Sequence, residues 1–446
     1  MDFSPFFLSR FQFALTICFH FIFPTISIGL AWLLVVIEWQ GYRKGDEHYI
    51  RLGRFLGKIL ALTFVMGVAT GIVMEFQFGT NWSRYSEFVG DIFGAPLAAE
   101  GIFAFFLESS FMGLYIFGRN RVSKAVHVFS IFMVAVGATI SAFWILVANS
   151  WQQTPAGYVV QNGRAELASF FEAVFNPSTL PRFFHTMDAC LISGAFFVAG
   201  IAAYHLLINK ETEIAKKALK LAVIFGFIAS IAELFPFGDI HAKQVARTQP
   251  AKFAAMEGHF DTRNQAPMVV FGFPAGDPME LKFGIKVPLM LNLLAFGDLT
   301  TPVTGLNDFP ENERPPVLVT FLSFHSMVAL GGFFILVMSW AAFSLYRNTL
   351  YSNRKLLLLL VVSIPLPVIA TELGWIAAEV GRQPWIVQDL LRTSVAYSPT
   401  VSSAEIIFSI VLFSLIYLLL GALYLFLLIK EIKHGPQPVK DGGARQ

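Results

Sequence analysis

The chain has 446 residues, of which 55% are hydrophobic and only 14% are charged. This composition is too apolar for a soluble globular domain. The formal net charge of +2 gives no basic excess of the kind that neutralises nucleic-acid phosphates. We therefore expect a membrane protein that binds no nucleic acid.

The N-terminus lacks the charged start and the small-residue cleavage site of a secretory signal, so its first apolar segment is expected to stay in the protein. A membrane-crossing helix needs roughly 20 mainly apolar residues. Nine segments qualify: residues 13–38, 55–78, 94–117, 124–148, 186–208, 218–236, 318–345, 356–378 and 404–429. The sequence predicts an all-α, polytopic membrane protein with a single membrane domain, residues 1–446.

Positive charge alternates along the connections between these segments. Lys and Arg residues follow the odd-numbered segments: Arg43, Lys44, Arg51, Arg54, Arg119, Arg121, Lys124, Lys210, Lys216, Lys217, Arg347, Arg354, Lys355, Lys430 and Lys433. The connection after the second segment has only Arg84 against Glu87 and Asp91. The positive-inside rule therefore places the N-terminus outside and the C-terminus, with a flexible tail at residues 434–446, in the cytoplasm.

The longest connection, residues 237–316, is polar and is predicted to lie on the outer face. A loop of this length is usually functional or disordered. Its front part contains helix-forming residues and two isolated titratable side chains, Lys252 and Glu257, so we expect a short surface helix there. The back part is expected to be irregular.

Titratable and iron-ligating side chains lie within the apolar segments, where they are costly and usually mark a pathway, a ligand or a cofactor. Alternating helix directions place eight of them in the outer half of the membrane: His20, Glu75, Glu100, Glu108, His185, Met327, Glu372 and Glu379. We infer a shared buried site. His127 and His205, near the inner side, are interpreted as packing residues.

Haem suits these ligand types. A His/Met pair gives six-coordinate, low-spin iron suited to electron transfer, and His185 with Met327 can form such a pair. Five-coordinate iron, which keeps one face open for dioxygen, needs a single protein ligand, and His20 or a glutamate can supply it.

The acidic residues of the third segment are spaced for proton transfer. Glu100 and Glu108 are eight residues apart, about 12 Å along a helix. Lys58 and Ser141 can extend such a relay toward the cytoplasm. The same groups also fit a proton-coupled secondary transporter gated by the long loop, although the sequence has no convincing internal symmetry of the kind expected for one.

The run GRQPW at residues 381–385, preceded by Glu379, resembles the signature of subunit I of the cytochrome bd quinol oxidases. Four further runs are similar to the same family: GVATGIVMEFQFGTNWSRYSEFVGDIFGAPLAAEG (67–101), FFLES (105–109), SAFWILVANSW (141–151) and FFHTM (183–187). The resemblance spans the chain. It implies a bacterial inner-membrane enzyme that oxidises ubiquinol or menaquinol outside and reduces dioxygen to water with cytoplasmic protons, generating a proton gradient without pumping.

The resemblance also implies roles for individual residues. His185 and Met327 would ligate a low-spin haem b, and His20 and Glu379 would ligate iron within a high-spin pair, with Arg382 and Trp385 as further cofactor contacts. Glu100 and Glu108 would serve beside that pair in iron ligation or proton delivery, and Lys58 and Ser141 would line the proton channel. Lys252 and Glu257, in AKFAAMEG, would bind quinol through a Lys hydrogen bond and a Glu proton acceptor.

The implied cofactors are three haems: a low-spin haem b, a high-spin haem b, and a third that is haem d or a further haem b. The implied partners are subunit II and a small single-helix accessory subunit. The runs CFHFIFPTISIGLAWL and GDIHAKQVARTQPAKFAAMEGHF resemble the cyanide-insensitive branch, and the loop resembles the short quinol loop.

This chain departs from the family pattern at two positions. His325 replaces the usual Arg two residues before the methionine ligand, and Asn120 replaces an acidic residue at the channel mouth. His325 can either tune the low-spin haem or compete with Met327 as a ligand.

Overall fold

The structure, a computed structural model, describes residues 4–276 and 279–438, and of residues 103 and 104 it describes the backbone alone. Nine stretches within these residues are long and apolar enough to cross a membrane: Pro5–Lys44, Glu47–Thr80, Ser83–Gly118, Lys124–Gln153, Thr179–Leu207, Thr212–Thr248, Val317–Tyr346, Arg354–Val380 and Ser403–His434. The predicted all-α fold with nine spans is therefore confirmed.

Six spans are continuous helices, and most of their ends lie beyond the predicted ones because the helices continue past the apolar runs. They are α1 (Pro5–Lys44), α2 (Glu47–Thr80), α5 (Lys124–Gln153), α7 (Thr179–Leu207), α12 (Val317–Tyr346) and α15 (Ser403–His434). Of these, α5 starts at the predicted residue 124, and α7 ends at 207 rather than 208. The other three spans are interrupted. They comprise α3 (Ser83–Ala99) with α4 (Phe106–Gly118), α8 (Thr212–Ala232) with α9 (Asp239–Thr248), and α13 (Arg354–Val362) with α14 (Leu366–Val380).

The interruptions have local causes. A π-helical turn, Glu100–Phe105, joins α3 to α4, and such turns often lie at functional sites. A second π-helical turn, Glu233–Gly238, joins α8 to α9 and is kinked at Phe235, directly before Pro236, which lacks an N–H donor. The predicted end of the sixth span at residue 236 is thus a kink, after which the helix resumes.

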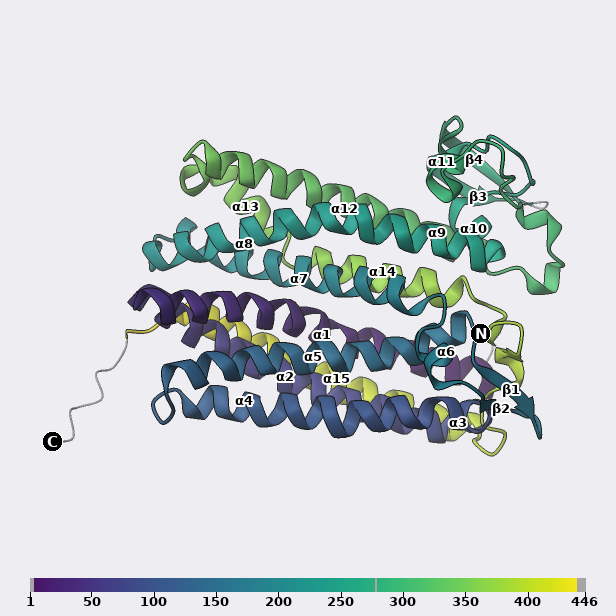
Figure 1. Ribbon diagram of the computed structural model, residues 1–446, viewed down its shortest axis with the longest axis horizontal. Helices are drawn as coiled ribbons and strands as arrows, with labels where there is room; N and C mark the ends of the chain where they lie inside the picture. The colour runs from purple at the N-terminus through teal and green to yellow at the C-terminus, as the bar shows by residue number, and fades with distance from the viewer. Residues whose placement is uncertain (1–3, 277–278, 439–446) are drawn as a thin grey trace.

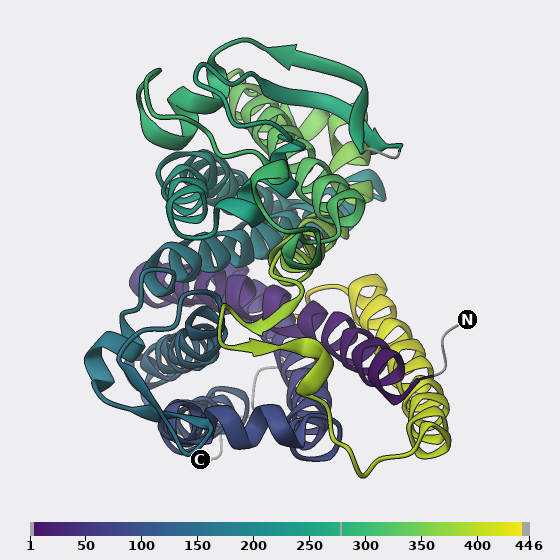
Figure 2. The ribbon, with the colours of Figure 1, turned by 90° about the vertical axis from the view of Figure 1, so that its right-hand side faces the viewer.

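The spans run side by side along the long axis, and α1 begins at the opposite end of the bundle from the end of α15 (Figure 1). Small residues allow close packing at the centre. A Cβ on Gly29 of α1 would lie 2.0 Å from the backbone oxygen of Cys190 on α7, so these two helices touch backbone to backbone. Helix α15, yellow in Figure 2, lies at the periphery.

The end of the bundle where α1 begins carries the long connections, and we call it the outer end. They contain α6 (Phe170–Val174), α10 (Pro250–Glu257), α11 (Met290–Phe296) and short 3-10 turns at Leu306–Asp308, Glu311–Glu313 and Thr393–Val395. A further 3-10 turn, Leu350–Ser352, lies at the opposite, inner end. Three antiparallel hairpins are present: β1 (Tyr158–Gln161) with β2 (Arg164–Leu167), β3 (Met268–Ala275) with β4 (Glu280–Val287), and β5 (Trp385–Val387) with β6 (Leu391–Arg392).

Two predictions about residues 237–316 are wrong. The back part is not irregular, because it forms the β3–β4 hairpin and α11. The front part is not a surface helix, because α10 buries Lys252 and Glu257, which are 4% and 7% exposed. Helix α10 lies against α12, and its Lys252 bonds Gln153 of α5. Of the predicted flexible tail, residues 439–446 lie outside the described residues.

Candidate functional site

Two predicted iron ligands, His185 on α7 and Met327 on α12, lie at one depth. Gly226 of α8 provides a reference depth for both helices. A Cβ on it would lie 2.9 Å from Ala195 Cβ of α7 and 2.8 Å from Met338 Cε of α12, so Ala195 and Met338 lie at the same depth. His185 is ten residues and Met327 eleven residues further toward the outer end, or about 15 Å and about 16 Å at the rise of an α-helix.

The third candidate ligand, His20 of α1, lies at a similar depth. The contact between Gly29 and Gly194 fixes the level of α1 against α7. His20 and His185 each lie nine residues outward of this contact, or about 13 Å. The structure thus places the three side chains from three spans in one outer layer.

The hydrogen bond between His20 and Thr70 engages one ring nitrogen, Nδ1. Its Nδ1 lies 2.9 Å from Thr70 Oγ1, and that hydroxyl donates to the backbone oxygen of Met66 at 2.8 Å. The Thr70 hydroxyl therefore accepts a hydrogen bond from Nδ1–H, and Nε2 keeps its lone pair. A Cβ on Gly71 would lie 3.1 Å from His20 Cε1, so only glycine leaves this edge of the ring uncrowded. This tautomer suits iron ligation through Nε2.

His185 lies in a cluster of titratable side chains from α7 and the kinked sixth span. Its Nδ1 is 3.0 Å from Glu233 Oε1, but the two are not aligned as a hydrogen bond, and Nδ1 has no other partner in the described part of the chain. Asp188 interacts with Glu233, and the His241 ring centroid is 5.0 Å from that of His185. Asp188, Glu233 and His241 were not among the predicted site residues, although charged residues within predicted spans are the signal that could have identified Asp188 and Glu233.

Met327 packs closely on α14, since a Cβ on Gly374 would lie 2.8 Å from its sulfur atom. His325, its expected competitor, is engaged elsewhere. Its Nδ1 lies 3.1 Å from the Phe321 backbone oxygen and its Nε2 3.0 Å from that of Val269. Both ring nitrogens of His325 therefore face backbone carbonyls, while the Met327 sulfur faces the α12–α14 contact.

Glu379 is the centre of a buried polar network near the outer end of α14. Its Oε1 accepts hydrogen bonds from Asn149 Nδ2 and Gln153 Nε2, both at 3.1 Å, and its Oε2 pairs with Arg382. The Arg382 Nε and Nη1 atoms are buried without partners among the described residues. Trp385 stands at the edge of this region, with the Arg392 guanidinium 4.9 Å from its ring centroid.

Glu372, seven residues deeper on α14, differs from Glu379. Both of its carboxylate oxygens are buried and neither has a hydrogen-bond partner in the residues that the structure covers. The Cys18 thiol lies beside it. Among the described residues, Glu372 thus has no partner beyond the Cys18 thiol.

The structure joins Ser141 to the acidic residues of the third span. Ser141 Oγ donates to Glu100 Oε1 at 2.8 Å, and Glu75 and Glu108 lie near enough to interact electrostatically with Glu100. Glu100 begins the π-helical turn that interrupts this span.

Lys58 does not lie beside Ser141 and Glu100. Its side chain is 60% exposed and donates to Glu431 of α15 at 3.1 Å. The buried polar group at that depth is instead Glu38, which pairs with Arg119 and accepts a hydrogen bond from Tyr115 Oη at 2.8 Å. Glu38, Arg119 and Tyr115 were not among the predicted site residues.

Asn120, also near the inner end, is exposed. His127 and His205 each bond a backbone carbonyl, of Tyr115 at 3.1 Å and of Ile432 at 2.7 Å. These contacts agree with the interpretation of both histidines as packing residues.

Lys252 and Glu257 form a second buried region, on α10. Lys252 Nζ donates to Gln153 Oε1 and, at 2.9 Å, to Gln249 Oε1. Burial, with Arg182 nearby, holds the pKa of the Lys252 ammonium well below its usual range. Burial raises the pKa of Glu257 to about 8, and its Oε2 has no described partner. Because Gln153 also donates to Glu379, one amide connects Lys252 to the network on α14.

These residues fit haem. The donor set contains imidazole and thioether, which are axial ligands of haem iron, together with carboxylate oxygens. His185, Glu372 and Arg382 contribute buried polar atoms without described partners, and such atoms are rare unless a further group satisfies them. Among the described residues no three His, Cys, Asp or Glu side chains could enclose a bare metal ion, whereas porphyrin-bound iron needs only one or two protein ligands.

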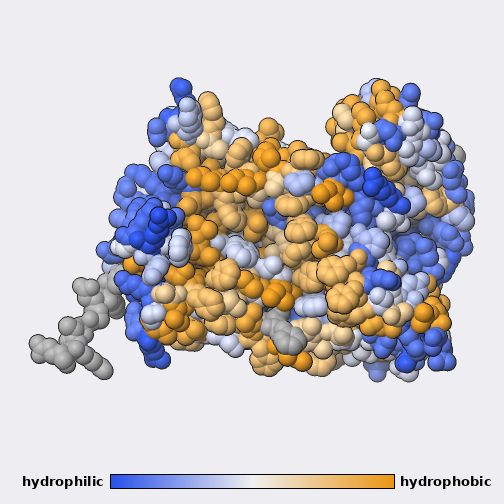
Figure 3. Space-filling view, in the orientation of Figure 1, coloured by the Kyte–Doolittle hydropathy of each residue, from blue (hydrophilic) through white to orange (hydrophobic). Residues whose placement is uncertain are grey.

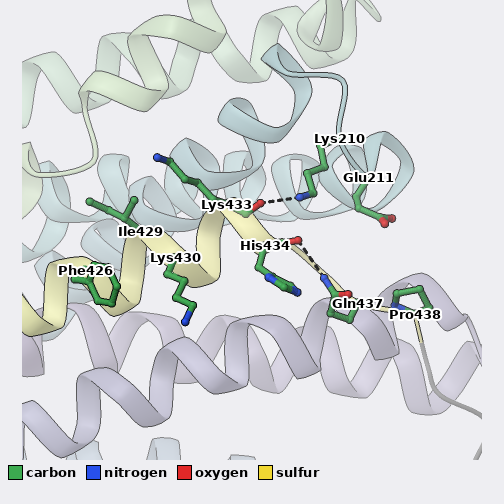
Figure 4. A pocket seen from close by; sticks show the side chains of 9 residues that line it. All are labelled: Lys210, Glu211, Phe426, Ile429, Lys430, Lys433, His434, Gln437 and Pro438. Carbon is green, nitrogen blue, oxygen red and sulfur yellow. Dashed lines mark hydrogen bonds between the residues drawn. The ribbon is translucent and has the colours of Figure 1, made fainter.

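An open pocket lies at the inner end, far from these residues. It is lined by four cationic or titratable nitrogen side chains, Lys210, Lys430, Lys433 and His434, from the α7–α8 connection and the end of α15 (Figure 4). None of the predicted site residues contributes to it.

The fold and this layer define a polytopic membrane protein whose buried side chains are suited to haem. The model of the family "cytochrome bd terminal oxidase subunit I" matches residues 8–436. Cytochrome bd ubiquinol oxidase subunit 1 of Bacillus subtilis is 40% identical over 96% of this chain and 94% of its own length. Cytochrome bd-II ubiquinol oxidase subunit 1 of Escherichia coli is 36% identical over 97% of each chain.

The solved structure of the bd oxidase from Geobacillus thermodenitrificans is similar with a TM-score of 0.92 and 35% identity, covering 98% of this chain and 100% of that chain. The chain belongs to the cytochrome bd terminal oxidase subunit I family. It is a multi-pass protein of the bacterial inner membrane, and oxidases of this family combine subunit I with subunit II. Family membership speaks against the transporter alternative.

Proposed function

We propose that the chain is the haem-bearing subunit of a quinol:oxygen oxidoreductase that oxidises ubiquinol or menaquinol at its outer face. The names of the relatives support the substrate class. The observation that carries the proposal is the buried pair Lys252 and Glu257, which lies outside the spans and is connected through Gln153 to Glu379.

Lys252 and Glu257 supply complementary chemistry for a quinol. The Lys252 amine donates a hydrogen bond to a quinol oxygen, and the ionised form of Glu257 accepts a hydroxyl proton. The unpartnered Glu257 Oε2 is the atom that receives it. Both residues lie near the outer surface, so the released proton leaves on the outer side.

We assign His185 and Met327 to a low-spin haem b, and His20 and Glu379 to iron of a high-spin pair that comprises haem b and either haem d or a further haem b. Bound haem supplies electron transfer and the reduction of dioxygen. Thr70 holds His20 in the tautomer that leaves Nε2 free. Arg382 and Trp385 are further cofactor contacts, and the two unpartnered guanidinium nitrogens of Arg382 suit a haem carboxylate.

Protons for dioxygen reduction come from the cytoplasm. Ser141 and Glu100 share a hydrogen bond, and Glu108 continues the acidic path inward along α4. Glu100 can serve in this path or as an iron ligand, and Lys58 is assigned to the cytoplasmic end. Cations gather at the inner end (Figure 4), which supports an outside N-terminus and a cytoplasmic C-terminus.

The enzyme generates a proton gradient without pumping, because quinol protons are released outside while cytoplasmic protons are consumed. Residues 237–316 serve as the external quinol-binding loop of a single membrane domain. Subunit II and a small single-helix accessory subunit complete the complex. The peripheral helix α15 leaves apolar surface for lipid or for these partners.

The test uses the purified complex. Reduced-minus-oxidised spectra are expected to show haem bands, and quinol is expected to drive oxygen uptake, with ubiquinol and menaquinol compared directly. His20→Ala is expected to abolish uptake. A colourless preparation of folded, full-length complex would refute the proposal.

A further inference from the structure

A lobe projects sideways from the bundle at its outer end, above α12 (Figure 1). It consists of the hairpin β3–β4 and α11, and we call it the hairpin lobe. The membrane normal runs along the spans, so a sideways projection at this end overhangs the outer surface of the bilayer rather than extending away from it.

A hydrogen bond fixes the height of the hairpin lobe. The Val269 backbone oxygen of β3 lies 3.0 Å from Nε2 of His325, the ninth residue of α12. Helix α12 has 30 residues, about 45 Å, against about 30 Å for the hydrocarbon core, so about 7 Å extends beyond each boundary. The Cα of His325 lies about 12 Å below the start of α12. Its side chain points back toward the helix N-terminus, so the imidazole lies closer to the outer boundary than the Cα does. Val269 therefore lies close to the boundary between headgroups and acyl chains.

The exposed face of the hairpin is apolar. Phe271 and Ile285 are directly paired across the strands and are each 62% exposed, and Phe283 is 85% exposed. Other large apolar side chains of the lobe are also exposed: Val270, Phe273, Leu293 and Leu294. Contiguous exposed apolar surface of this kind usually marks an interaction site.

The direction of this surface identifies its partner. In the space-filling view the part of the lobe turned toward the inner end is orange, like the apolar belt of the spans, whereas the part turned outward is paler and bluer (Figure 3). At the start of α12, Leu318, Val319 and Leu322 are exposed and continue the belt up to the lobe. The apolar side of the lobe is thus turned toward the bilayer that surrounds the spans.

Two lysines of β4 complete the pattern. Lys282 and Lys286 are exposed, and neither has an ion-pair partner within residues 4–276 and 279–438. Lysines at a membrane boundary extend their amines toward anionic headgroups while their stems cover apolar surface. A two-stranded hairpin has unpaired backbone edges, which the hydrocarbon core does not tolerate. Both features favour the interfacial depth over the core.

We propose that the hairpin lobe is seated in the outer leaflet, with Phe271, Phe283 and Ile285 against acyl chains and with Lys282 and Lys286 at lipid phosphates. This contact does not depend on the proposed function. It makes the lobe a lateral, lipid-bound part of the subunit rather than a soluble appendage.

The test uses the complete complex in lipid nanodiscs with a fluorescent NBD label at single cysteines, Phe283→Cys and, as the aqueous control, Glu311→Cys. Glu311 is exposed in the 3-10 turn before α12. Labelling of the parent chain, whose two cysteines lie within spans, gives the background. The label at 283 is expected to emit at shorter wavelength, and to lose more fluorescence to doxyl-labelled lipid than to iodide. The label at 311 is expected to do the reverse.

Equal quenching of both labels by iodide would overturn the proposal, as would protection of position 283 from both quenchers, which would indicate a protein partner instead of lipid. The lysines are tested separately. Adding phosphatidylglycerol to phosphatidylcholine nanodiscs is expected to increase lipid quenching at 283, and the double variant K282Q/K286Q is expected to lose this increase. If the increase persists in the double variant, the assignment of these lysines to headgroups is wrong.

Discussion

Burial gives Glu257 the protonation behaviour required of a proton acceptor near neutral pH. Its pKa is raised to about 8 by burial, so the ionised fraction grows as the pH rises through 8. A residue that accepts a quinol proton must be ionised first. The position of this carboxyl outside the spans allows the proton to leave toward the outer surface.

We expect quinol-driven oxygen uptake to increase with pH from 6 to about 8 and to level off above the pKa of Glu257. Glu257→Gln removes the acceptor and should lower kcat/KM by about 10²-fold or more, while the haem spectrum is unchanged. Glu311→Gln, at an exposed site, is the matched control. A Gln variant that keeps both the activity and the pH profile would exclude Glu257 as the proton acceptor.

Glu379 and Glu372 are expected to respond differently to substitution, because Glu379 pairs with a buried guanidinium whereas Glu372 has only the Cys18 thiol beside it. Glu379→Ala leaves Arg382 buried and unpaired, and loss of one partner of a buried ion pair costs about 3–5 kcal/mol. We therefore expect Glu379→Ala to lower Tm and to lose both haem and oxygen uptake. Glu372→Ala breaks no ion pair and removes only the contact with the Cys18 thiol, so it should have a much smaller effect on Tm.

Haem content and Tm, measured together, separate ligation from folding. Glu379→Gln keeps an acceptor for Asn149 and Gln153, so it should restore part of the stability but not the oxygen uptake. If Glu372→Ala loses haem at unchanged Tm while Glu379→Gln retains it, the iron ligand on α14 is Glu372 and not Glu379.

At the scale of elements, the spans were predictable because an apolar run is a local property of the sequence. The buried state of Lys252 was not, because its partner Gln153 is 99 positions away. The β3–β4 hairpin was also missed: its strands contain Gly272, Pro274 and Gly284 and its register is irregular, so the alternation that marks a strand is broken. Whether Glu372 has hydrogen-bond partners is decided by the side chains that neighbouring helices place beside it. The spacing of residues along α14 does not predict those side chains.

Close contacts between helices position Met327. Replacing Gly374 with Val would add a Cβ that lies 2.8 Å from the Met327 sulfur and two methyl groups beyond it, and overpacking of this kind costs about 1–3 kcal/mol. We expect Gly374→Val to displace Met327 and to convert low-spin haem partly to high-spin, seen as a weaker low-spin α-band and as new carbon monoxide binding. Gly331→Val on α12 is the control, since a Cβ there meets nothing within 4 Å. An unchanged low-spin band in a folded Gly374→Val complex would argue against Met327 as the ligand.

At the scale of the whole molecule, the distance between the outer polar region and the inner polar region determines whether turnover moves charge across the membrane. The quinol candidate Lys252–Glu257 lies outside the spans at the outer end, whereas Glu108 and the Glu38 cluster lie along the path from the inner end. Oxidation of one quinol releases two electrons and two protons, and water formation consumes one proton per electron. If release and uptake occur at opposite ends without pumping, the number of protons appearing outside equals the number of electrons transferred.

Proteoliposomes that hold the complex in the native orientation test this balance. Quinol should acidify the external medium by one proton per electron, and Ser141→Ala should slow turnover without changing the ratio, because it removes the hydrogen bond to Glu100 and not the site of release. Lys58→Met is the informative comparison, since Lys58 is exposed and bonds Glu431 rather than the acidic path. Equal slowing by Lys58→Met would place the proton entrance at the α2–α15 contact, and normal turnover would place it at the Glu38 cluster. A ratio well above one would require a pump, for which this chain would need a second, gated path across the same bundle.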